Sequence, residues 1–96
     1  MTNPVTAPLI RRALLELLTE IGGEQNHEVL AALLNEAGQR VAVSDTRTEL
    51  EWLRDAGCIH AEQLGPFLMA RILADGRDIA EGRKNVDGVW RYRLGE

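Results

Sequence analysis

The spacing of apolar residues predicts two helices in the first 40 positions of the chain. Pro8 suits a first helical turn, and the apolar stripe after it recurs every 3.6 residues until the glycines at 22–23. Additional leucines beside this stripe indicate that the first helix is contacted on two sides. Asn26 is suited to capping a second helix, whose leucine stripe ends before Gly38.

A third helix is predicted from Ser44, as its N-cap residue, to a stop at Gly57. Its buried stripe consists of leucines, and Trp52 falls on the outward side of a helical wheel. A large ring is costly to leave in water, so we expect something to cover Trp52. The cover is either the fourth helix or the C-terminal tail of the same chain, or a second copy in a dimer.

After Gly57 the apolar period changes from 3.6 to 2, which predicts strands. Residues 59–62 alternate, "LGPF" is a turn, and "FLMARIL" is a strand facing the core, so the two runs form a β-hairpin. Helical spacing returns in "ADGRDIAEGR" and ends at Gly82. The predicted fold class is mainly α with a small β-hairpin. Three helices, a hairpin and a fourth helix follow the order of a winged helix-turn-helix, with the hairpin as the wing.

The chain length fits a single domain with one core. We expect residues 1–7 to form a flexible arm, residues 8–84 the winged-helix domain, and residues 85–96 a C-terminal tail.

The net charge of −4 is unevenly distributed along the chain. Residues 1–63 hold five basic and ten acidic side chains, whereas residues 64–96 hold six basic and five acidic ones. Because phosphate contacts supply much of the affinity for nucleic acid, any nucleic-acid surface is expected in the second half. The alternative is ordinary surface charge, balanced by Asp75, Asp78, Glu81 and Asp87. The tail adds Trp90 and Tyr92 between basic residues.

Two motif blocks resemble the small winged-helix proteins of Mu-like bacteriophages and prophages. "RTELEWLRDAGCI" is similar to the family pattern R-T-E-L-x-W-L-x-x-x-G-L-I/V, and "LADGRDIAEGRKNVDGV" to L-T-x-x-G-x-D-V-A-x-G-R with a V-x-G-V-like tail. About half of the chain is covered, and Cys58 stands where such chains often have Leu. The resemblance implies a phage-encoded winged-helix protein, similar in fold to ArsR-type transcriptional regulators. The matching residues are Arg47, Thr48, Glu49, Leu50, Trp52, Leu53, Gly57, Leu73, Gly76, Asp78, Ala80, Gly82, Arg83, Gly88 and Val89.

The third helix supplies most of the candidate DNA-binding residues. In a reading helix the first turns contact bases, and an arginine there pairs with a guanine edge. The alternative is that Ser44 caps the helix, its threonines are solvated, and Arg47 pairs with Glu51 one turn on. Four acidic residues on this helix oppose tight DNA binding. The candidates are Ser44, Thr46, Arg47 and Thr48, with Arg71 and Arg77 from the basic second half.

A second set of candidates forms a protein interface. The additional leucines of the first helix and the outward Trp52 favour a homodimer, or contact with a phage or host protein. The candidate residues are Leu9, Leu18, Trp52, Trp90 and Tyr92.

The chain lacks the side chains that catalysis or metal binding needs. Cys58 and His60 have i, i+2 spacing, but His27 is the only other histidine and there is no second cysteine. No nucleophile–base pair or glycine-rich phosphate loop is present, so we expect no cofactor, no metal and no enzymatic activity.

We expect a bacterial cytoplasmic protein with no membrane span or secretory signal, because apolar runs are short and the one cysteine forms no internal disulfide.

The first functional hypothesis is a regulator that binds double-stranded DNA. The second is a protein-interaction module that uses the acidic third helix and Trp52, acting in phage assembly, in DNA packaging or on a host protein.

Overall fold

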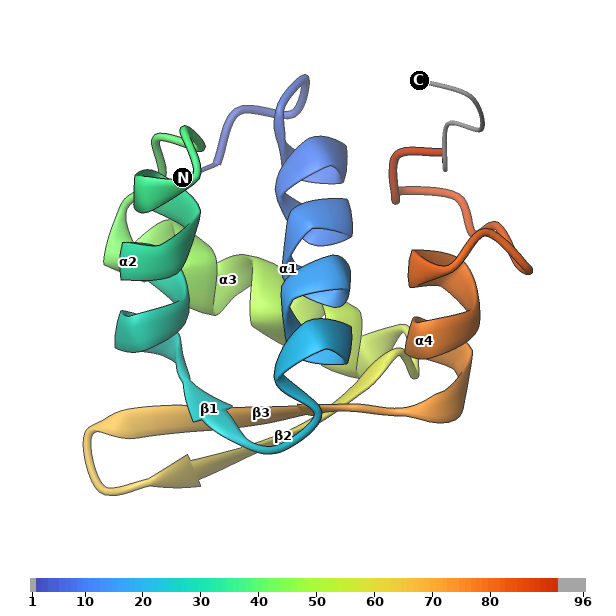
Figure 1. The fold of residues 1–96 in the computed structure, drawn as a ribbon. Helices are drawn as coiled ribbons and strands as arrows, with labels where there is room; N and C mark the ends of the chain where they lie inside the picture. Colours follow the sequence, from blue (N-terminus) through green and yellow to red (C-terminus); the bar gives the residue numbers. More distant parts are fainter. Residues whose placement is uncertain (1, 92–96) are drawn as a thin grey trace.

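The computed structural model describes residues 2–91 of the 96-residue chain. These residues form a compact mixed α/β domain with four helices and three strands (Figure 1). The predicted helices and hairpin are present, and a short first strand is an addition. In chain order the elements are α1 (Ala7–Ile21), β1 (Gln25–Asn26), α2 (His27–Glu36), α3 (Val43–Asp55), β2 (Ile59–Leu64), β3 (Phe67–Ile72) and α4 (Ala74–Ala80).

The strands form an antiparallel sheet in the order β1-β3-β2. The β2–β3 hairpin pairs from Ile59 opposite Ile72 to Leu64 opposite Phe67, around a two-residue turn. Gly65 opens this turn with a φ of 57°, a conformation that suits a tight hairpin. The two residues of β1 pair with β3 on its other edge. The sequence did not reveal β1 because two residues are too short to show a period.

Helix α1 lies at the centre of the core and packs against α2, α3, α4 and β3. Leu14, Leu15 and Leu18 on it are completely buried. The additional leucines therefore serve contacts within one chain, since elements pack on more than one side of α1. The prediction that Leu18 lies at a protein interface is wrong, because neighbouring elements already cover its side chain.

The helix ends follow the sequence in part. Asn26 caps α2, since its side-chain oxygen accepts a hydrogen bond from the Val29 N–H at 2.9 Å. The prediction that Ser44 caps α3 is wrong, because the N-cap position is two residues earlier, at Ala42, and no side chain caps the helix. The Nδ2 of Asn35 donates to the carbonyl of Val41 at 2.8 Å, which fixes the link before α3.

Residues 86–91, within the predicted tail, pack back against α1. The N–H of Trp90 donates to the carbonyl of Pro8 at 3.1 Å, and Val89 is buried. Arg12, itself buried, donates to the carbonyl of Trp90 and, at 2.9 Å, to that of Ile79 in the last turn of α4. Since the last carbonyls of a helix have no partner within it, Arg12 both closes α4 and holds the chain after it.

None of the helices in residues 2–91 is both long enough and apolar enough to cross a membrane.

Candidate nucleic-acid interface

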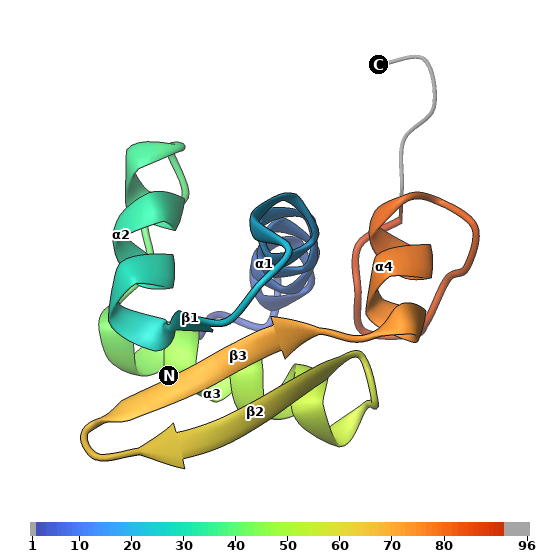
Figure 2. The same ribbon diagram turned by 60° about the horizontal axis from the view of Figure 1, so that its bottom comes forward.

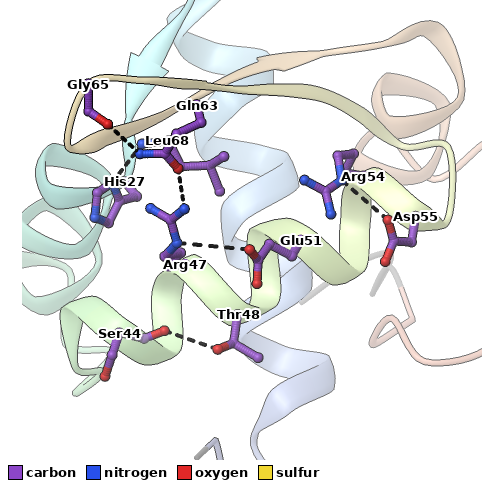
Figure 3. Close-up of polar contacts among 10 residues, drawn as sticks. All are labelled: His27, Ser44, Arg47, Thr48, Glu51, Arg54, Asp55, Gln63, Gly65 and Leu68. Carbon is purple, nitrogen blue, oxygen red and sulfur yellow. Dashed lines mark hydrogen bonds and ion pairs between the residues drawn. The ribbon is translucent and has the colours of Figure 1, made fainter.

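Helix α3 and the β2–β3 hairpin are in contact, with α3 behind the hairpin in Figure 2. Figure 3 shows Arg47 of α3 reaching toward the hairpin, where its guanidinium donates to the side-chain oxygen of Gln63. The Nε2 of Gln63 in turn donates to the carbonyl of Gly65 in the hairpin turn at 2.7 Å. A continuous polar connection therefore joins the exposed side of α3 to the hairpin turn.

The first turns of α3 present two exposed hydroxyls, on Ser44 and Thr48. The hydroxyl of Thr48 donates to the carbonyl of Ser44 at 3.1 Å. Thr46 has no exposed surface, and its hydroxyl donates to the carbonyl of Ala42 at 3.1 Å. The prediction that Thr46 contacts DNA is wrong, because its side chain points into the protein while those of its neighbours point outward.

The acidity of α3 is partly internal. Glu49 is only 3% exposed, and one of its carboxylate oxygens lies 2.6 Å from the Nε of Arg11 on α1. Its negative charge is therefore neutralised inside the protein. On the surface, the Nε of Arg47 lies 3.8 Å from a carboxylate oxygen of Glu51, which is the i, i+4 pairing that the sequence offered as the alternative to DNA contact.

Trp52 is covered by its own chain. The guanidinium of Arg11 lies 4.0 Å from the centre of the Trp52 ring, and the ring also packs against the core. A Cβ atom added to Gly88 would lie 2.5 Å from the ring, so the chain after α4 also lies against it. Part of the cover is the C-terminal tail of the same chain, which was one of the predicted covers. The other part is α1, which was not among them. Trp52 is thus partly buried within its own chain.

The remaining sequence candidates are spread over the molecule. Arg71 is exposed on β3, paired in register with His60 of β2, so it belongs to the same hairpin as Gln63. Arg77 is exposed on α4, which packs against α1 at the other end of the molecule from the first turn of α3 (Figure 1). The structure therefore brings Arg71, but not Arg77, to the hairpin beside α3.

Besides the partly buried Trp52, two of the predicted interface residues remain accessible to some degree. Trp90 is 38% exposed beside a shallow pocket of about 410 Å³ that Pro8 and Arg91 also line. Leu9 is half-buried. Tyr92 lies outside the described residues.

Sequence reasoning missed Arg54 and Gln63. Arg54 is exposed on α3, where its Nε lies 3.2 Å from a carboxylate oxygen of Asp55 (Figure 3). Its spacing of seven residues from Arg47 places both arginines on one helical face, and this signal was present in the sequence. Gln63 carried no signal, because its contact with Arg47 depends on how the hairpin folds back.

Residues 2–91 contain no group of three His, Cys, Asp or Glu side chains arranged to hold a metal ion. Cys58 is buried, and this burial raises the pKa of its thiol, with the nearby charge of Asp75 adding to the increase. His60 is exposed, with its Nε2 3.7 Å from a carboxylate oxygen of Glu62.

The fold and this interface define a small mixed α/β domain in which one helix and one hairpin share a polar face. The uncharacterized protein gp26 of Escherichia phage Mu is 30% identical to the chain over 93 residues, which are 97% of each protein. The chain therefore belongs to the family of this Mu phage protein. No family model matches the chain. No solved structure matches it either.

Many of the residues that match the motifs of the phage family have structural roles. Glu49, Trp52 and Gly88 all contact Arg11, whose Nη1 donates to the carbonyl of Gly88 at 2.9 Å. Arg83 pairs with Asp78 at 2.7 Å, which raises the pKa of the Arg83 guanidinium. These contacts connect α1, α3 and the chain after α4, so much of the motif pattern describes how the domain packs.

Proposed function

We propose that the chain is a winged-helix protein of a Mu-like phage that binds double-stranded DNA as a transcriptional regulator, without catalytic activity. The element order, the sheet order β1-β3-β2 and the position of the hairpin beside α3 all support this proposal. In winged helix-turn-helix proteins the second helix of the motif lies in the major groove, and α3 would take that position here.

One observation carries the proposal: Arg47 lies at the junction of α3 and the hairpin. From this position its guanidinium reaches either a guanine edge in the major groove or an adjacent phosphate. The exposed hydroxyls of Ser44 and Thr48 lie on the same first turns and supply further donors. Arg54 further along α3 and Arg71 on the hairpin extend the surface toward the DNA backbone.

The carboxylates on this face set the expected strength of binding. The ion pairs of Arg47 with Glu51 and of Arg54 with Asp55 are solvent-accessible, and such pairs contribute about 0–1 kcal/mol each. A phosphate can replace the carboxylate in either pair, because charge-assisted hydrogen bonds to phosphate are strong. The carboxylates that a phosphate displaces from these pairs still repel DNA, so binding is expected to be modest and to weaken steeply with salt.

Electrophoretic mobility shifts with fragments of the genome of the phage that encodes the protein test the proposal. We expect retardation at micromolar protein in about 50 mM salt, where non-specific affinity alone is visible. Arg47→Ala and Arg54→Ala should each weaken binding about tenfold, since each removes one phosphate-type contact. Glu51→Gln should strengthen binding severalfold, because it removes a competing charge.

Arg77→Ala is the matched control, since Arg77 is an exposed arginine on α4, away from the first turn of α3. It should leave binding unchanged within about twofold, as a surface change away from the contact does. Absence of any shift at micromolar protein would overturn the proposal. Equal losses in Arg47→Ala and Arg77→Ala would overturn the assignment of the surface.

The second function, a protein-interaction module in phage assembly, in DNA packaging or on a host protein, needs a different surface from the one the sequence indicated. That surface was Trp52 together with the acidic side of α3. Trp52 is covered by Arg11 and by the chain at Gly88, and Glu49 is buried. The observation that favours a protein partner is instead the groove between α1 and α2.

A further inference from the structure

Helices α1 and α2 enclose an open groove of about 260 Å³ on the surface of the domain. No residue of α3 or of the hairpin lines it. Its floor is apolar, and carboxylates stand along the α1 side. The apolar lining residues are Ala13, Leu17, Leu33, Leu34 and Ala37, and the polar ones are Glu16, Glu20 and Gln39.

The helices around the groove carry a strongly negative surface. All of the glutamates on α1, on α2 and between them are exposed, whereas the two arginines of α1 are engaged within the protein. Arg11 pairs with Glu49, and Arg12 is buried against the end of α4. Helix α2 has no lysine or arginine, and its histidine is buried. The exposed carboxylates are those of Glu16, Glu20, Glu24, Glu28 and Glu36.

We propose that this groove binds a basic amphipathic helix of a protein partner. Such a helix places apolar side chains every three or four residues, which match the leucine floor, and presents lysine or arginine to the carboxylates beside it. The α1 wall from Ala13 to Glu20 is about 10 Å long, enough for two turns of the partner. Burial of the apolar residues supplies affinity, and the carboxylates select a positively charged helix.

The charge of the groove argues against two other occupants. DNA is a polyanion and has no attraction for a surface lined by glutamates. A symmetric dimer through this groove would place one set of carboxylates against the same set in the second copy, because two-fold interfaces are self-complementary. A basic helix of another protein is the remaining occupant that fits both the apolar floor and the charge.

The groove and the proposed DNA surface use separate parts of the domain. In Figure 1, α1 and α2 lie in front of α3. Since the two surfaces share no residue, a partner helix on α1 and α2 leaves α3 and the hairpin unobstructed. The domain is thus able to hold a protein and another ligand at once.

Fluorescence anisotropy with a labelled peptide tests the proposal. The probe is a helical peptide of leucine and lysine, about 14 residues or four turns long, with leucines on one face. A scrambled peptide of the same composition, which lacks the apolar face, is the control for charge alone. We expect the amphipathic peptide to bind at micromolar concentration and the scrambled peptide at least tenfold more weakly. Equal binding of the two peptides would overturn the proposal.

Variants then locate the site. Glu20→Lys and Leu33→Ser should each weaken peptide binding about tenfold, and both replace residues that retain surface exposure, so the fold is expected to survive. Asp87→Lys makes the same change in net charge as Glu20→Lys, at an exposed residue outside the groove, and should leave binding unchanged. Thermal melting confirms that each variant is folded.

Two results would contradict the assignment. One is a loss of binding in Asp87→Lys equal to that in Glu20→Lys, which would show that total charge rather than the groove governs binding. The other is a concentration-dependent dimer in sedimentation that Leu33→Ser abolishes, which would make a second copy the occupant. Neither result depends on whether α3 binds DNA.

Discussion

At the scale of single residues, Arg11 connects more of the molecule than any motif pattern indicated. Its guanidinium meets the carboxylate of Glu49, the ring of Trp52 and the carbonyl of Gly88. The sequence predicted that Trp52 needs a cover but did not identify Arg11, which lies 41 positions away in the chain. Periodicity shows which face of a helix is apolar, whereas a polar contact between distant helices depends on how they pack.

Replacing Arg11 by methionine should lower the free energy of unfolding by about 3–5 kcal/mol, because the buried carboxylate of Glu49 then has no cationic partner. Urea denaturation followed by circular dichroism measures this change. The double variant Arg11→Met, Glu49→Leu should recover much of the loss, since it removes both charges. Arg77→Met, on an exposed arginine, should change the stability by less than about 0.5 kcal/mol. An effect of Arg11→Met no larger than that of the control would contradict the prediction.

At the scale of elements, glycines mark several boundaries that the sequence predicted correctly. Gly22 ends α1 with a φ of 77°, and Gly57 follows α3 with a φ of 79°. The N-cap of α3 was misplaced by two residues, because a serine near a helix start resembles a cap whether or not its side chain makes the bond. Thr46 was misassigned for a related reason: composition identifies a donor, and only the rotation of the helix decides whether that donor faces solvent.

The contact between α4 and the chain entering β2 depends on Gly76. A Cβ atom there would lie 2.1 Å from the carbonyl oxygen of Cys58 and 2.8 Å from the side chain of Ile72. Gly76→Ala should therefore destabilise the protein by about 1–3 kcal/mol or more, since α4 must move away from the backbone. Thermal melting measures the loss. Ala74→Gly, on an exposed residue of the same helix, should cost at most about 1 kcal/mol. A melting temperature unchanged by Gly76→Ala would show that α4 shifts without cost.

At the scale of the whole molecule, the net charge of −4 conceals two surfaces of different character. The sequence predicted an acidic first half and a more basic second half. It did not predict that Arg12 and Glu49 would be buried and that Arg11 would be paired with Glu49, because linear counts treat every charge as exposed. When these three charges are left out of the surface charge, the surface of α1 and α2 is more negative than the sequence indicated. The surface of α3 is less negative than the sequence indicated. The proposed protein and DNA surfaces follow from this redistribution.

The two proposed ligands should bind without competing. With both surfaces occupied, the anisotropy of the labelled basic peptide should remain at its bound value when unlabelled duplex DNA is added to the protein in excess. The affinity for DNA should also change by less than about threefold when the peptide is present, because the coupling of two sites is reciprocal. Free peptide mixed with DNA alone is the necessary control, as lysines bind phosphate directly. Displacement of the peptide from the protein at a DNA concentration too low to bind free peptide would contradict separate surfaces.

The two arginines of α1, of which Arg11 is partly buried and Arg12 is buried, have a consequence for how the chain is made. Ribosomal synthesis proceeds from the N-terminus, so Arg11 and Arg12 emerge long before Gly88 and Trp90, whose carbonyls accept their hydrogen bonds. A nascent chain that stops short of these residues leaves both guanidinium groups without those acceptors. The domain therefore completes these contacts only when residues 88–90 have left the ribosome.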